Sequence, residues 1–110
     1  MKKCYQMISK ILNEAQFMDI KAVSGPCEKF TDRELSRAIR MGIAAEHEAT
    51  HLYEVIADNT NNPDVKKLMQ DIANEEKVHV GELESLLATI DSNDKEKREE
   101  GNKEFEEKVG

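Results

Sequence analysis

Residues 35–90 read LSRAIRMGIAAEHEATHLYEVIADNTNNPDVKKLMQDIANEEKVHVGELESLLATI, two long amphipathic segments separated by a short polar break. When the second segment is projected at about 100° per residue, its large apolar side chains fall on one face, as in an amphipathic helix. Glu76 lies at the centre of that face, and His79 lies on it one turn later. Glu46 lies at the centre of the apolar face of the first segment. We therefore expect two helices that direct carboxylates toward a shared core.

Carboxylates in a helical core need compensation of their charge. A buried carboxylate without a partner costs several kcal/mol or gives up its charge. No Lys or Arg lies beside Glu46 or Glu76 on these two apolar faces. A bound metal ion is therefore the simplest explanation for Glu46, Glu76 and His79, and a buried polar cluster without a metal is the alternative.

The composition is that of a small, acidic, helix-rich protein. Of its 110 residues 35% are charged, and only two prolines and five glycines interrupt it, which favours a single domain of the all-α class. The net charge of −7 argues against a nucleic-acid partner. No segment has the length and apolar character of a signal peptide or a membrane span. We expect a cytoplasmic protein in which Cys4 and Cys27 are free thiols, with a disulfide closing the N-terminal segment as the alternative.

Helix-start signals define the first of the two central helices. Thr31-Asp32-Arg33-Glu34 is a capping box, because the Thr31 hydroxyl can accept from the backbone N–H of Glu34 while the Glu34 carboxylate accepts from that of Thr31. The box predicts a helix over about residues 32–58. The preceding residues, 1–30, are expected to form a separate helix over residues 1–20 and then a loop.

A short connection joins the two central helices. Asn62 and Pro63 are typical of the cap and first position of a helix, so the second helix is expected over about residues 63–90, antiparallel to the first. The predicted organisation is thus an N-terminal helix and loop (1–30), an antiparallel helical hairpin (31–90) and a charged C-terminal helix or tail (91–110). Because one hairpin leaves apolar edges exposed to water, we expect two copies to complete a four-helix bundle. The edge residues are Leu52, Ile56, Leu68 and Leu86.

The spacing of the polar residues predicts a two-metal site. Glu76 and His79 lie one turn apart on the same helix face, so both can bind one ion. Glu46 on the facing helix completes a set of two carboxylates and one imidazole. A two-fold axis doubles this set to four Glu and two His, the ligands of di-iron and di-manganese carboxylate bundles. Such oxygen-rich ligation suits iron or manganese better than a metal that prefers thiolates.

Two neighbouring features have two interpretations each. Glu48-x-x-His51 repeats the Glu-x-x-His spacing, but its residues lie about 160° and 140° from Glu46 around the helix. We interpret this repeat as an exposed coincidence, with a secondary surface for metal ions or a partner as the alternative. Tyr53 shares the face of Glu46 two turns later, either as a core aromatic whose hydroxyl finds a partner or as a hydrogen-bond donor or redox-active phenol near the metals.

The hairpin resembles the encapsulated ferritins, ferritin-like proteins of half length, and is similar to the first helical pair of rubrerythrins. The resemblance covers about residues 32–90 and rests on two motifs: Glu46 followed seven residues later by Tyr53, and the run Glu75-Glu76-Lys77-Val78-His79. It implies a ferroxidase with a di-iron centre between two subunits, in which Glu46, Glu76 and His79 of each chain bind iron. It implies oxidation of Fe(II) by dioxygen for iron storage or detoxification. It also places Glu48 where the family has an acidic residue at which metal ions enter.

The resemblance also implies partners. It predicts a dimer or a higher, ring-like homo-oligomer, packed inside the shell of an encapsulin nanocompartment. Leu52 stands where the family has Trp, Ala45 stands where it has an acid, and residues 106–110 are not an obvious shell-targeting peptide.

Two other functions remain open at this point. One is a rubrerythrin-like di-iron peroxidase, although no rubredoxin-type pair of Cys-x-x-Cys motifs occurs in the sequence. The other is a non-catalytic helical dimer held together by a metal such as zinc or calcium. Other divalent metals are expected to bind the same ligands in vitro.

Overall fold

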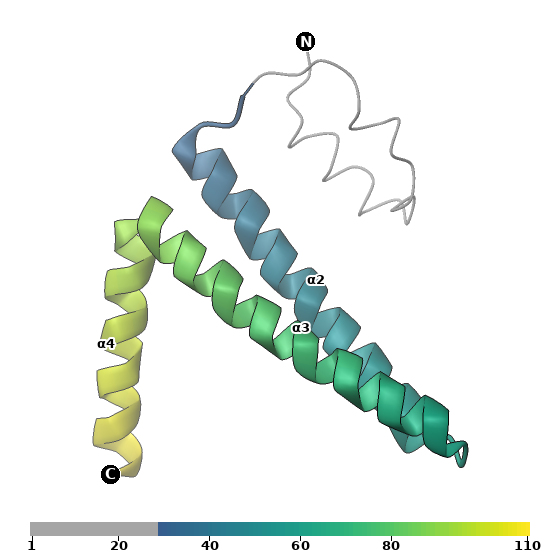
Figure 1. Ribbon diagram of the computed structural model, residues 1–110. Helices are drawn as coiled ribbons and strands as arrows, with labels where there is room; N and C mark the ends of the chain where they lie inside the picture. Colours follow the sequence, from purple (N-terminus) through teal and green to yellow (C-terminus); the bar gives the residue numbers. More distant parts are fainter. Residues whose placement is uncertain (1–28) are drawn as a thin grey trace. The chain divides into compact units, whose positions relative to one another are not determined.

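The computed structural model describes residues 29–110. The helix expected over residues 1–20, and both Cys4 and Cys27, lie outside the described residues. The described residues form three helices and no strand: α2 (Asp32–Asp58), α3 (Pro63–Ile90) and α4 (Ser92–Val109) (Figure 1). The all-α class is therefore confirmed. In this part of the chain no helix combines the length and the apolar character that crossing a membrane requires.

The start of α2 is stabilised by the capping box. The Glu34 carboxylate accepts a hydrogen bond from the backbone N–H of Thr31 at 3.0 Å, and the Thr31 hydroxyl accepts one from the backbone N–H of Glu34 at 3.2 Å. The first N–H groups of a helix have no partner inside the helix, so these side-chain acceptors stabilise its first turn. The helix begins at Asp32, as the box predicted.

The loop between α2 and α3 is closed by polar contacts from both helices. The Asn62 side chain caps α3 by accepting from the backbone N–H groups of Asp64 and Val65 at 3.0 and 3.2 Å, and Pro63 occupies the first turn. The last turn of α2 contains no basic residue. Instead, Lys66 of α3 donates to the backbone carbonyl of Ala57 at 2.9 Å, which satisfies an unpaired acceptor at the negative end of the α2 dipole.

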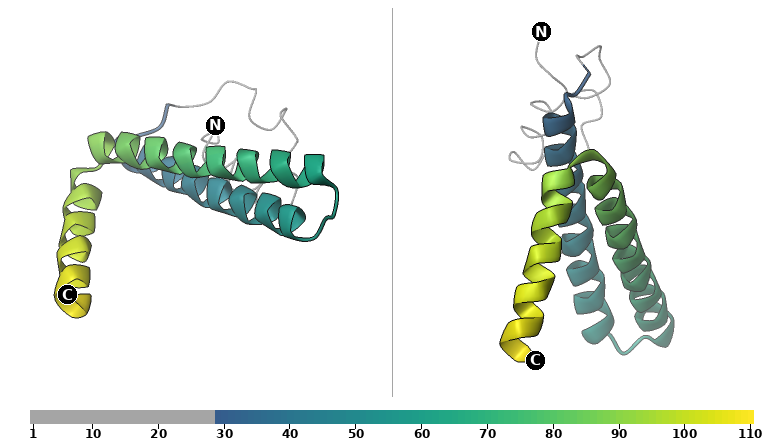
Figure 2. Two further views of the ribbon diagram at one scale, coloured as in Figure 1. Left: turned by 60° about the horizontal axis from the view of Figure 1, so that its bottom comes forward. Right: turned by 90° about the vertical axis from the view of Figure 1, so that its left-hand side faces the viewer.

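Residues 29–38 and 39–110 belong to two compact units, and the hairpin described here lies in the second. From Ile39 to its end, α2 lies antiparallel beside α3 (Figures 1 and 2). The contacts between the two helices fit this antiparallel arrangement. Ala57, close to the loop, contacts Lys66, and Glu54, one turn farther from it, contacts Lys77. The core of the hairpin is small and apolar, consisting of Ile39, Ala57, Ala73, Val80 and Leu87.

The apolar edge residues of the hairpin are exposed. The side chains that the sequence placed at the edges keep 36–55% of their surface accessible. One layer of two helices cannot cover both edges of its apolar faces, so a large part of each of these side chains stays uncovered within the described chain. They are Leu52, Ile56, Leu68 and Leu86.

A sharp corner at Asp91 separates α3 from α4. The backbone N–H of Asp91 donates to the Leu87 carbonyl and ends α3, while its side chain accepts from the backbone N–H of Asp94 and starts α4. Arg40 of α2 pairs with both carboxylates, at 2.8 Å for Asp91 and 3.0 Å for Asp94. Figure 2 shows α4 leaving the hairpin at a steep angle. None of its residues is buried, so the charged C-terminal segment is a solvated helix.

Candidate metal centre

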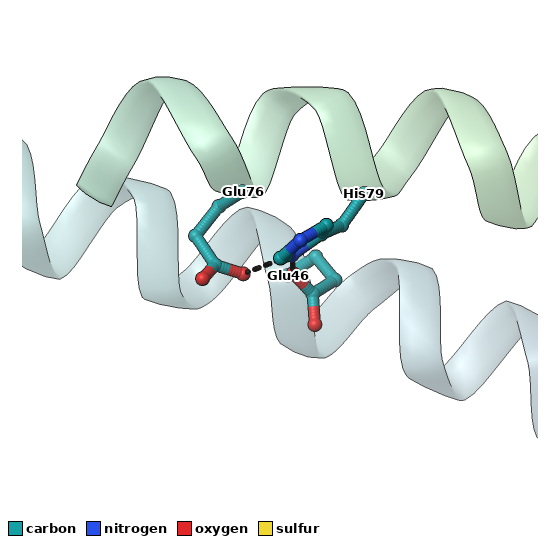
Figure 3. A group of neighbouring side chains, drawn as sticks. All are labelled: Glu46, Glu76 and His79. Carbon is teal, nitrogen blue, oxygen red and sulfur yellow. Dashed lines mark hydrogen bonds and ion pairs between the residues drawn. The ribbon is translucent and has the colours of Figure 1, made fainter. Parts of the chain in front are cut away.

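Three side chains meet midway along the hairpin. Glu46 comes from α2, and Glu76 and His79 come from α3 (Figure 3). One ligand atom from each residue lies within 4.8 Å of the others. The His79 Nδ1 atom lies 3.3 Å from Glu46 Oε2 and 3.5 Å from Glu76 Oε2. The structure thus brings together the three residues that sequence analysis placed on facing apolar stripes.

The three side chains are covered to different degrees. Glu76 keeps 16% of its side-chain surface accessible, Glu46 27% and His79 49%. In a single chain the carboxylate side chains are therefore mostly covered at the helix interface, while about half of the imidazole surface stays accessible. The desolvation cost that suggested a metal applies fully only when another layer covers this side.

The charge of the group favours a cation. Within residues 29–110, no Lys or Arg forms an ion pair with Glu46 or Glu76, and the only cationic side chain paired with either is His79, when protonated. The neighbouring Lys77 is engaged elsewhere, because its ammonium pairs with Glu54 of α2 at 3.0 Å. Two carboxylates and one imidazole form a mixed oxygen and nitrogen donor set that suits a divalent transition metal such as iron, manganese or zinc. The residues present therefore fit a metal ion.

The backbone at Glu46 is supported by a residue whose role sequence analysis did not identify. The Thr50 side chain is buried and donates to the backbone carbonyl of Glu46 at 2.9 Å. This hydrogen bond satisfies the Thr50 hydroxyl within α2, one turn after Glu46. A hydroxyl residue four positions after a candidate ligand is the sequence signal that could have revealed it.

The two remaining candidates lie outside the three-residue group. Tyr53 is half-buried on α2, and its hydroxyl makes no hydrogen bond within the described chain. Glu48 is fully on the exposed side, as is His51, in agreement with the helical projection. Among residues 29–110, the only cluster of three or more potential metal-binding side chains is the one formed by Glu46, Glu76 and His79.

Comparison with known proteins extends this description. The family model described as Rubrerythrin matches residues 6–87 and 35–109. The chain is 42% identical over 62 residues to the ferritin-like–encapsulin shell fusion protein of Pyrococcus furiosus, and 41% identical over 63 residues to the encapsulin nanocompartment cargo protein EncC of Myxococcus xanthus. These matches cover 56% and 57% of this chain but only 18% and 48% of the relatives, so the chain spans less than half the length of either.

A solved structure gives the same relationship. The crystal structure of the encapsulated ferritin domain from Pyrococcus furiosus superposes with a TM-score of 0.74 at 35% sequence identity. The match covers 78% of this chain and 88% of that domain. Because the family model matches most of the chain and this domain is matched over most of its length, the chain belongs to the rubrerythrin family and, within it, to the encapsulated ferritin-like proteins.

Proposed function

We propose that this protein is a ferroxidase, which oxidises Fe(II) to Fe(III) with dioxygen at a di-iron centre formed between two copies of the chain. The observation that carries the proposal is the group of Glu46, Glu76 and His79, whose ligand atoms lie within 4.8 Å of one another without a paired Lys or Arg in the described chain. Iron is the substrate of this reaction, and the protein supplies its ligands.

A second copy of the chain is needed because one chain supplies too few ligands. Three side chains leave a transition-metal ion with open positions. On α3, Leu68 and Leu86 lie within about 20° of His79 around the helix, given about 100° per residue. Both leucines are exposed, by 55% and 47%, and so is the imidazole. A helix pair that covers these leucines would therefore also cover His79 and add its own Glu46, Glu76 and His79.

The protein contributes to this reaction mainly through the position and the charge of the iron ligands. Two Fe(II) ions each give one electron to a single dioxygen, which with two protons becomes hydrogen peroxide. The four carboxylates of the doubled group stabilise the more highly charged Fe(III) more than Fe(II), which favours electron loss. The two His79 imidazoles would bind the ions without adding negative charge. Fe(III) would therefore be bound weakly enough to leave the site.

Iron handled in this way needs a store, since a helical hairpin encloses no cavity for a mineral. Two relatives are an encapsulin cargo protein and a fusion with an encapsulin shell. We propose that this chain likewise works inside an encapsulin shell, as a dimer or ring-like oligomer, and delivers Fe(III) for storage or detoxification there.

Anaerobic loading of the apo-protein with Fe(II), followed by mixing with oxygen, tests the ferroxidase proposal. We expect rapid oxidation, followed by near-ultraviolet absorbance, that saturates near about one iron per chain, as a two-ion centre shared by two chains requires. Glu76→Gln should slow this phase to the rate of iron in buffer. Glu75→Gln is the matched control, because Glu75 is the adjacent acid but is exposed. Equal rates for Glu76→Gln and the wild type would refute the assignment of the site.

Membership of the rubrerythrin family favours one second candidate, a di-iron peroxidase that uses the same three ligands. The two functions differ in their oxidant. If the Fe(II)-loaded protein reacts much faster with hydrogen peroxide than with oxygen, the peroxidase is the correct function. If neither oxidant reacts faster than in buffer, while metal removal dissociates the dimer, the group is a structural metal site.

A further inference from the structure

A second arrangement of metal-binding side chains lies on the outer side of α2. His47-Glu48-Ala49-Thr50-His51 has the form His-Glu-x-x-His. It lies within the uninterrupted helix Asp32–Asp58, so the two imidazoles are spaced four residues apart on one face. Side chains at this spacing have Cβ atoms about 5–6 Å apart, and two histidines so placed on a helix can bind the same zinc ion.

Both imidazoles are free to bind an ion. His47 and His51 are exposed, and neither makes a hydrogen bond or ion pair within residues 29–110. Around the helix they lie about 40° from each other, and about 100° and 140° from Glu46. The pair is therefore separate from the carboxylate group, and a metal ion bound to one set cannot share ligands with the other.

The surroundings of the pair are acidic. Glu48 lies between the two histidines, and Glu54 follows His51 by one turn. The Lys77 ammonium and, as a weaker influence, the His51 imidazole lower the pKa of Glu54, which places His51 within electrostatic reach of that carboxylate. The net charge of the whole chain is −7, which favours the approach of cations.

We propose that His47 and His51 bind a divalent ion of the zinc class on the exposed face of α2, at a site distinct from the ferroxidase centre. Neutral imidazoles prefer zinc, nickel or copper, whereas the carboxylates of the other group suit harder ions. Within the described chain no third side chain joins the pair, so water completes the coordination. The site is therefore a two-ligand surface site for an ion and lacks the three protein ligands of a catalytic zinc.

The histidine content of the chain allows a clean test. The chain has three histidines, so each single replacement leaves two. In a His79→Ala background, which removes the imidazole of the carboxylate group, Zn²⁺ affinity is measured by competition with a colorimetric chelator. Adding His47→Ala or His51→Ala should weaken Zn²⁺ binding by about tenfold or more, on the scale of other losses at metal sites. Unchanged affinity in both double variants would overturn the proposal.

A relocated pair tests the geometry. Val55 is exposed and lies four residues after His51, so Val55→His combined with His47→Ala rebuilds the spacing one turn along α2. In the same background this variant should recover the Zn²⁺ affinity, and failure to recover it would show that the two histidines do not act as a chelating pair. Helix content by circular dichroism confirms that each variant is folded, and in the protein with all three histidines Zn²⁺ should shift the imidazole NMR signals of His47 and His51 together.

Discussion

At the scale of single residues, position on the helix decides whether a side chain stabilises the fold or remains available for function. Val78 and Val80 flank His79 on α3, yet the first keeps 60% of its surface accessible and the second only 9%. Glu75 and Glu76 differ in a similar way, since Glu75 is exposed, whereas Glu76 is partly buried and points toward α2 (Figure 3). Neighbouring residues of the same chemical type therefore have different roles, and this provides matched controls on both sides of the metal group.

The two valines lead to a prediction about stability. Val80→Ala removes two buried methyl groups from the hairpin core and should lower the free energy of unfolding by about 1–2 kcal/mol. Val78→Ala removes the same atoms from an exposed position and should change it by less than about 0.5 kcal/mol. Urea unfolding followed by circular dichroism measures both. A similar loss for the two variants would mean that the hairpin core does not lie where the structure has it.

At the scale of elements, the corner between α3 and α4 depends on charge. Arg40 is 51 positions before Asp91 in the sequence and pairs with both Asp91 and Asp94. Arg98 adds bonds to Asp94 and to the backbone carbonyl of Glu84. The helix α4 has no buried side chain, so these ion pairs and its cap take the place of an apolar contact in orienting it.

The ion pairs at the corner between α3 and α4 should stabilise it less at low pH. The backbone N–H of Asp94 and the Arg40 guanidinium hold the pKa of Asp91 below its ordinary value of 3.8, and Arg40 does the same for Asp94. A carboxylate with a lowered pKa in the folded state stabilises that state above the ordinary value and loses this contribution as the pH falls through the lowered one. We therefore expect α4 to lose helix content below about pH 4. Because the pairs are exposed, the effect should be modest and should shrink in high salt.

The matched comparison for this prediction is Arg40→Gln. It removes the guanidinium shared by the two carboxylates, so helix content at neutral pH should already be slightly lower and the change on acidification smaller than in the wild type. Circular dichroism between pH 7 and pH 2 follows both proteins. If their acid transitions coincide, Arg40 does not hold the corner.

At the scale of the whole molecule, the exposed apolar edges of the hairpin are its most unusual feature. In a monomer, the apolar side chains of Leu68 and Leu86 stay exposed to water beside a half-exposed His79. A second copy would bury these side chains and complete the metal group at the same time. Assembly and catalysis are therefore expected to fail together.

We expect Leu86→Glu to produce a monomer, because two introduced carboxylates would face a buried interface. The same variant should lose rapid Fe(II) oxidation, since each chain keeps only half of the ligands. Val109→Glu is the control, because Val109 is at least as exposed but lies on α4, away from His79. Sedimentation equilibrium measures the mass, and oxygen mixing measures the oxidation. A Leu86→Glu dimer, or a monomer that oxidises iron at the wild-type rate, would contradict the two-fold centre.

Much of this molecule follows from sequence alone, because the signals that determine it are local. Hydrogen bonds of the Thr31–Glu34 box and of Asn62 act over three residues, so the starts of α2 and α3 could be predicted closely from local sequence. Helical periodicity depends only on spacing, and it placed Glu46, Glu76 and His79 on facing stripes before any contact was known. The sequence also contains the four-residue spacing of His47 and His51, but only the helix α2 shows that both side chains are exposed and unpaired within residues 29–110.

Tertiary structure decided what depends on partners distant in the sequence. Periodicity gives the direction of a side chain but not how much of it is covered, so the open side of His79 became visible only when α2 and α3 were packed together. The charged residues 92–109 were equally compatible with a helix or a tail, because their few apolar groups cannot bury enough surface to choose. Arg40, far away along the chain, adds ion pairs to the Asp91 cap and to Asp94 at the start of that helix. Ion pairs between distant residues and the burial of side chains by neighbouring helices leave no periodic pattern in a sequence. Only the folded chain reveals them.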